Sequence, residues 1–317
     1  MKKKVRIFAA IFLIAATALQ AQQRNTVVTM TSSANLVSIS VKYAGTGTIA
    51  ANGITLNNGS KTTGIPVFNG KVTISATENI KLTELSCHSN QLTQLDLSKS
   101  TALLFLSCDN NLLTQLDLSK NIALTRLNCS YNRLTYLDVT KNTALAWLSC
   151  ERNKLTQLYV NQNTALTWIG CESNYLTQLD VSKNTALEFL YCYNNKLTQL
   201  DVTKNTALTW LDCHSNLLSS LDISKNKKLT YLDAEKQAVK VAVLRDATTF
   251  PNPINYRNKT AVENAKLNGT AYAFGANTPL SAKKEKIPFT TNKTISEGNP
   301  FGGVITFVPD TQQPQLR

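Results

Sequence analysis

Histidine is scarce in this sequence. Only two occur among 317 residues, His88 and His214, and each directly follows a cysteine. Neighbouring residues on a β-strand point to opposite faces, so neither imidazole can serve as the base for the cysteine beside it. A Cys–His or Ser–His enzyme therefore has no place in this chain, and we expect a protein without enzymatic activity.

Long apolar segments are missing after the first 21 residues. The chain begins MKKKVR, runs from Ile7 to Leu19 without a charge and reaches a small residue at Ala21. This pattern predicts a secretory signal peptide over residues 1–21, because the apolar run is too short to cross a bilayer as a helix. We expect an exported protein without a transmembrane segment. Its expected place is outside the cell or on the cell surface, with the periplasm as the alternative.

Concentrated positive charge is also missing, although the chain is basic. Lys and Arg number 33 against 20 Asp and Glu, and removal of the four bases in the signal leaves a net charge of +9. The surplus lies in the flanks, in runs of at most two residues, whereas residues 82–237 contain 14 bases and 14 acids. A nucleic-acid-binding protein gathers its bases on one face. We therefore expect no nucleic-acid partner.

Cysteine occurs at one spacing only. The seven cysteines are spaced 21 residues apart, within the pattern L-x-x-L-x-C-x-x-N. Ile169 replaces the second leucine once, and the asparagine of this pattern never varies. A fixed period of this length with a Leu/Asn framework is typical of a leucine-rich repeat. The sequence thus predicts a solenoid over residues 74–237, with a parallel β-sheet on one side. The cysteines are Cys87, Cys108, Cys129, Cys150, Cys171, Cys192 and Cys213.

The positions of the repeat, counted from its first leucine, have different environments. Alternation along the strand turns positions 4 and 6 inward, where free cysteine fits as a small apolar residue. Cysteines on adjacent strands approach poorly for a disulfide, and a row of thiols does not surround a metal ion. We expect seven buried free thiols, no metal site and no cofactor. The asparagine at position 9 is expected to bond the backbone of the turn.

The 21-residue period with cysteine at position 6 resembles the internalin family of bacterial leucine-rich repeat surface proteins, in particular its cysteine-ladder type. The resemblance covers about half the chain, and the ending LQAQ of the signal is similar to those of Bacteroides-type exported proteins with such repeats. The resemblance to the internalin family implies a curved solenoid whose concave sheet binds a partner, with a role in adhesion. No LPxTG-type wall-sorting motif follows the repeats, and neither flank resembles the internalin cap.

Aromatic residues occupy position 3 in six of eight repeats, on the side of the strand that faces away from the core; Glu84 and Arg126 occupy the other two. This column holds all three tryptophans, and positions 2 to 8 together contain 8 acids against 3 bases. Exposed rings in a row are typical of a contact surface, although they also cover one another in cross-strand ladders. The predicted partner-binding residues are Phe105, Trp147, Trp168, Phe189, Trp210, Tyr231, Tyr191, Tyr193, Glu151, Glu172, Asp212 and His214.

The flanks contain strand patterns without the repeat. Residues 22–73 are rich in Thr, Val, Ile and Gly, and they predict a β-rich N-terminal cap over the open end of the solenoid. Residues 238–317 contain NP, NG and GG turns between short apolar runs, and they predict a small β-rich C-terminal domain.

These features favour an exported, non-enzymatic binding protein. The expected activity is adhesin-like recognition of a protein on a host or neighbouring cell, through the concave aromatic and acidic face. One alternative is a structural spacer of the cell envelope, in which the repeats only hold two β-rich ends apart. The other is a glycan-binding module, because sugars stack on aromatic rings and bond to carboxylates.

Overall fold

The computed structural model describes residues 25–77, 79–234 and 237, together with the backbone of four short strands between residues 242 and 272. The predicted signal peptide and most of the predicted C-terminal domain lie outside the described residues. Every regular element in the described part of the chain is a β-strand. The described residues contain no helix that is long and apolar enough to cross a membrane.

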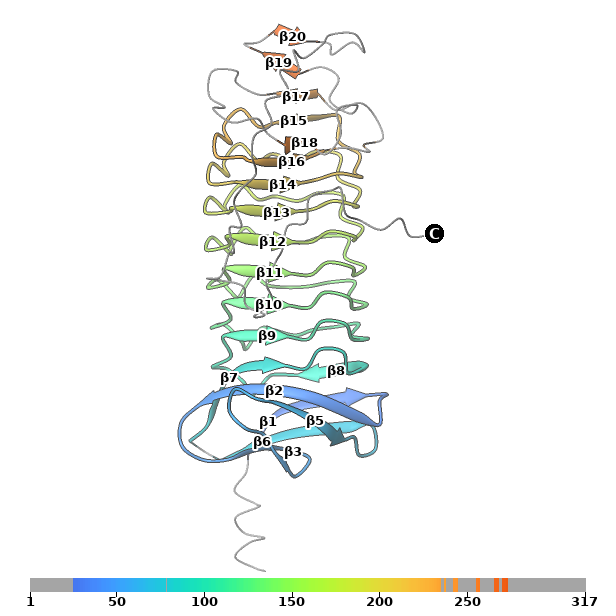
Figure 1. Ribbon diagram of the computed structural model, residues 1–317, viewed down its shortest axis with the longest axis vertical. Helices are drawn as coiled ribbons and strands as arrows, with labels where there is room; N and C mark the ends of the chain where they lie inside the picture. The colour runs from blue at the N-terminus through green and yellow to red at the C-terminus, as the bar shows by residue number, and fades with distance from the viewer. Residues whose placement is uncertain are drawn as a thin grey trace, which may run out of the picture. The chain divides into compact units, whose positions relative to one another are not determined.

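The repeats form a parallel β-solenoid of the predicted leucine-rich type, with one short strand per 21-residue turn (Figure 1). Each strand pairs in register with the residues 21 positions away, so Trp147 lies beside Trp168. The strands are β7 (Lys81–Ser86), β9 (Phe105–Ser107), β10 (Arg126–Asn128), β11 (Trp147–Ser149), β12 (Trp168–Gly170), β13 (Phe189–Tyr191), β14 (Trp210–Asp212) and β16 (Tyr231–Asp233).

Leucine and cysteine layers fill the interior of the solenoid. Leu145, Leu148 and Cys150 of one turn are fully buried, and the equivalent residues of the other turns are buried with them. All seven cysteines are free and buried, which confirms the predicted ladder of thiols. Burial raises the pKa of every one of them, for example that of Cys129 to about 12.

The asparagine at position 9 holds the turn that follows each strand. The residue before it has a left-handed backbone, as at Arg152 with φ of 48°. The Asn153 Nδ2 donates to the carbonyls of Cys150 and of Cys129 in the preceding turn, both at 3.0 Å, and its Oδ1 accepts from the Leu134 amide. The predicted role of this column in satisfying the turn is therefore confirmed.

A second asparagine column, at position 19, lies at another corner of the solenoid. The Nδ2 of Asn163 donates to the carbonyls of Val139 and Asn142 in the preceding turn, at 2.9 and 2.8 Å. These side chains are buried, and their Oδ1 atoms have no hydrogen-bond partner among the described residues. Each turn is thus bonded to the one before it at two corners. The column contains Asn121, Asn142, Asn163, Asn184, Asn205 and Asn226.

Antiparallel strands cover the N-terminal end of the solenoid. On the sheet side, β2 (Leu36–Ala44) pairs with β7 and with β5 (Lys61–Pro66); on the other side, β1 (Asn25–Ser32) pairs with β8 (Leu92–Asp96) and β6 (Lys71–Ala76). These pairings occupy the edge that the first repeat would otherwise expose. The short strands β3 (Ile49–Ala51) and β4 (Ile54–Thr55) complete the sheet of β1.

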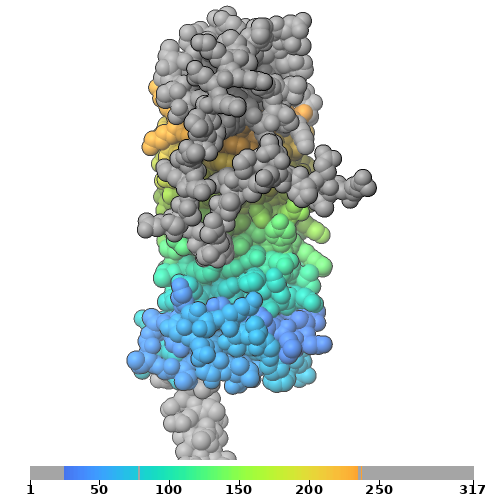
Figure 2. Space-filling model, in the orientation of Figure 1, coloured from blue at the N-terminus to red at the C-terminus, as the bar shows by residue number. Residues whose placement is uncertain are grey.

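The cap and the repeats share one hydrophobic core, and in Figure 2 the coloured surface passes from the cap into the first repeats without a gap. The predicted boundary at residue 73 falls inside β6, and the division into domains stays a prediction.

Parallel pairing also continues beyond residue 237. Strand β18 (Asn255–Tyr256) pairs with β16, while β17 (Ala242–Leu244) pairs with β15 (Ser220–Asp222). The strands β19 (Ala265–Leu267) and β20 (Thr270–Tyr272) form a hairpin beside β17.

Candidate functional site

The candidate site is the outward face of the parallel sheet, which we call the sheet face and define by positions 3, 5 and 7 of the repeats. The register of β11 to β16 places the predicted position 3 residues in one row. That row is half-buried rather than fully exposed, because the side chains lean on one another. Its members are Phe105, Trp147, Trp168, Phe189, Trp210 and Tyr231, with Arg126 between the first two.

Five rings of this face form a continuous aromatic ladder. Trp147 stacks on Trp168 with ring centroids 4.4 Å apart and an interplanar angle of 12°, and Trp210 stacks on Tyr231 at 3.7 Å and 11°. Tyr191 joins the two pairs, since its ring lies 5.6 Å from Trp168 and 5.9 Å from Trp210. The ladder therefore passes from position 3 to position 5 and back. Tyr191, and not the position 3 residue Phe189, connects Trp168 with Trp210.

The small residue at position 170 explains how Trp168 can join the ladder. The indole lies over Gly170, where a Cβ would come within 2.4 Å of the Trp168 Cη2 atom. Gly170 is buried beneath the ring and is the one glycine of the repeats. Glycine is present here because the indole needs the space, and its backbone conformation does not require it.

Two glutamates of the predicted site, Glu151 and Glu172, occupy position 7 of the sheet face. Glu172 is buried, with 6% of its surface exposed, and its Oε2 has no hydrogen-bond partner among the described residues. Burial, together with the hydrogen bond and the negative charge of the Glu151 carboxyl, raises the pKa of Glu172 to about 9. Both effects favour the protonated, neutral form of the Glu172 carboxyl.

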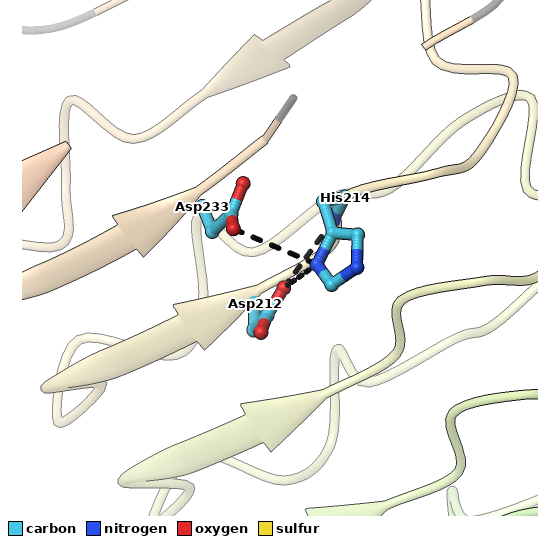
Figure 3. A group of neighbouring side chains, drawn as sticks. All are labelled: Asp212, His214 and Asp233. Atoms are coloured by element: carbon cyan, nitrogen blue, oxygen red, sulfur yellow. Dashed lines mark hydrogen bonds and ion pairs between the residues drawn. The ribbon is translucent and has the colours of Figure 1, made fainter. Parts of the chain in front are cut away.

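Asp212, His214 and Asp233 converge at the C-terminal end of the ladder, as Figure 3 shows. The two aspartates pair in register on β14 and β16. The His214 Nδ1 lies 2.5 Å from the Asp212 Oδ1 and 3.6 Å from the Asp233 Oδ2. Tyr193 stacks on the imidazole, with centroids 4.4 Å apart and an interplanar angle of 9°.

This group differs from the sequence-based prediction in two respects. Asp212 is buried rather than exposed, and Asp233, which the predicted site omits, faces the same imidazole. The sequence also predicted no metal site, whereas these three side chains are all of metal-ligand type. The signal was present as D-x-H at 212–214 with a further aspartate one repeat after Asp212. No single column shows this group, because it combines positions 5 and 7 of one repeat with position 5 of the next.

No protein-family model and no curated protein matches the sequence significantly. Among solved structures, the functional domain of internalin J from Listeria monocytogenes, which includes a cysteine ladder, is 27% identical over 68% of this chain and 57% of its own, with a TM-score of 0.34. The chain is similar to cysteine-ladder leucine-rich repeat proteins. Its own burial and hydrogen-bond ladders place it among leucine-rich repeat solenoids.

Two further structures show similar repeats. A leucine-rich repeat protein of Leptospira interrogans is 26% identical over 50% of this chain and 44% of its own, with a TM-score of 0.48. Internalin C2 of Listeria monocytogenes is 19% identical over 58% of this chain and 80% of its own, with a TM-score of 0.47. The chain thus spans 57% and 44% of the first two relatives. What the sheet face binds has to be inferred from its own residues.

Proposed function

We propose that this protein is an exported, non-enzymatic, adhesin-like protein whose sheet face binds a protein on the surface of a host or neighbouring cell. The aromatic ladder carries the proposal, because five large rings run side by side across an outward face. Solenoids offer extended surfaces of this kind to their partners, and buried aromatic anchors supply much of the binding free energy at interfaces. The predicted signal peptide supports export.

The arrangement of the rings favours a protein partner over a glycan. Trp168, Tyr191 and Trp210 each lie between two other rings of the ladder, so their faces are directed at neighbouring rings. Sugars stack on ring faces, whereas apolar side chains of a protein also pack well against ring edges. A glycan would need exposed ring faces, which these three residues do not offer.

The charge of the face indicates which protein segments fit. Acidic side chains border the ladder at Glu151 on one side and at the Asp212–His214–Asp233 group on the other. The basic residues Arg126 and Arg152 lie toward the N-terminal half of the face. A partner segment with apolar side chains and a few Lys or Arg residues would match the C-terminal half, and this charge match would speed association.

The spacer hypothesis gives the aromatic ladder a structural role in place of partner binding. In a spacer the rings only stabilise the sheet, and their removal lowers stability without affecting any partner. In a binding protein the removal of one ring lowers affinity far more than it lowers the stability of the fold.

The test uses the mature chain as bait for surface proteins extracted from candidate cells, together with a glycan array. A captured protein is then titrated by calorimetry against Trp168→Ala and against Tyr159→Ala, a matched loss of an exposed ring outside the sheet face. We expect Trp168→Ala to weaken binding at least thirtyfold, which corresponds to about 2 kcal/mol for one anchor. Unchanged affinity together with a much lower melting temperature would support the spacer, and binding only to the array would support the glycan module.

A further inference from the structure

We propose that Asp212, His214 and Asp233 bind a divalent transition-metal ion with the ligand preferences of Zn²⁺. One potential ligand atom from each of the three residues lies within 4.8 Å of the other two. The site lies on the adjacent strands β14 and β16 of the sheet face.

The backbone brings the three ligands together without any irregularity. Asp212 and Asp233 occupy position 5 of adjacent strands, and parallel pairing holds them side by side. His214 lies two residues after Asp212, so its side chain leaves the strand on the same face. The equivalent position 5 residues of earlier turns are Ser, Asn, Gly or Tyr, and the paired aspartates occur only at this end of the described face.

The distances suit a small ion after a modest adjustment. Tetrahedral zinc with bonds of about 2.1 Å separates its ligand atoms by about 3.4 Å. The His214 Nδ1 and the Asp233 Oδ2 are already 3.6 Å apart. The Nδ1 and the Asp212 Oδ1, now 2.5 Å apart, would separate by about one ångström as the metal replaces the proton between them.

Charge and burial favour a cation at this point. The Asp212 and Asp233 side chains are only 9% and 5% exposed, so water screens their two carboxylates poorly. Even a protonated imidazole leaves the three groups with a formal charge of −1. Coordination to a metal ion stabilises buried carboxylates. A divalent ion bound to a neutral imidazole and two carboxylates would bring this sum to zero.

The surroundings of His214 hold the imidazole in place. Tyr193 stacks flat against it and fixes the plane of the ring, with Nδ1 turned toward the aspartates. The His214 side chain is 21% exposed, which leaves a route to solvent. One nitrogen and two carboxylate groups form a ligand set that suits zinc better than calcium or magnesium, and a fourth position remains for water.

The test is zinc binding by the folded mature chain. Protein freed of metal with EDTA is titrated with ZnCl₂ by calorimetry, and metal content is measured after gel filtration. We expect one Zn²⁺ per chain and at least tenfold weaker binding by His214→Gln and by Asp233→Asn. His88→Gln is the matched control, because it removes the other histidine, which occupies the same repeat position, and should leave binding unchanged.

Three outcomes would overturn the proposal. One is wild-type protein that binds no more zinc than His214→Gln. Another is equal loss of binding in the His88→Gln control. The third is a Co²⁺ spectrum with thiolate charge-transfer bands, which would assign the metal to the cysteines. Circular dichroism of each variant shows that it is folded, and the isosteric Asp233→Asn keeps the test decisive if His214→Gln unfolds.

Discussion

The indole of Trp168 occupies the space in which Gly170 would carry a side chain. A Cβ at residue 170 would lie 2.4 Å from Cη2 and 2.8 Å from Cζ3 of that ring. The ring cannot step aside freely, because Trp147 stacks on it and Tyr191 contacts it from the next strand. The geometry of the ladder thus depends on the absence of one methyl group.

Gly170→Ala should therefore disturb the ladder while leaving the solenoid folded. We expect a reduced near-ultraviolet circular dichroism signal from the stacked Trp147–Trp168 pair and a loss of about 1–3 kcal/mol in stability from overpacking. Ser182→Thr is the control, because it adds one methyl group at a position where other repeats have threonine. An unchanged tryptophan signal in Gly170→Ala would show that the two rings are not coupled as described.

Asn153→Ala tests the position 9 ladder. The change removes the bonds that its Nδ2 donates to two cysteine carbonyls and leaves the Leu134 amide without its partner. We expect a loss of about 1–3 kcal/mol in the free energy of unfolding, measured with urea. Asn161→Ala, at an exposed position, should change it by less than about 0.5 kcal/mol. Similar losses at both sites would contradict the ladder.

Glu172 should make stability depend on pH. Its pKa is raised to about 9 in the folded protein from an ordinary value of 4.5, so the stabilisation is complete below pH 4.5 and is lost as pH rises toward 9. In that window the wild type should lose up to about 1.4 kcal/mol per pH unit relative to Glu172→Gln, which keeps a neutral side chain. Urea unfolding at pH 5 and pH 8 measures the difference.

The control for this pH dependence is Glu188→Gln, which removes an exposed carboxylate of the same strand region. Its stability should follow that of the wild type at both pH values. Parallel curves for the wild type and Glu172→Gln would instead mean that Glu172 is ionised in the folded protein.

The cysteine ladder predicts thiols that do not react until the protein unfolds. All seven are buried, and burial raises their pKa values, so that the reactive thiolate is rare at neutral pH. Titration with Ellman's reagent should find almost no thiol in the folded protein and seven after denaturation. Rapid labelling of the native chain, or fewer than seven thiols in urea, would contradict the ladder.

The features that the sequence predicted correctly repeat in every turn. The leucine, cysteine and Asn153-type columns occupy the same environment each time, so their period alone identifies the fold and the inward face. The Asn163-type column repeats equally well, but its spacing alone assigns it no role. Nothing in its sequence distinguishes an amide that bonds the preceding turn from one that faces water.

The candidate site was predicted less well because it depends on departures from the repeat. Glu172 is buried although its position faces away from the core, and the packing that buries it depends on side-chain rotamers. The convergence of His214 with Asp233 crosses two columns and two strands, so no single column shows it. Sequence spacing places such residues on one face, but side-chain packing determines which of them meet.

The two asparagine columns have a consequence for how this chain can change length over generations. Each Nδ2 bonds carbonyls 24 residues earlier and, at position 19, also 21 residues earlier, so every junction between turns uses the same donors and acceptors. Loss or duplication of 21 residues in the gene would rejoin identical partners at any junction. An insertion of any other length would misplace both amides at once. Natural variants of this protein should therefore differ by whole turns, and the N-terminal cap would tolerate such changes without alteration.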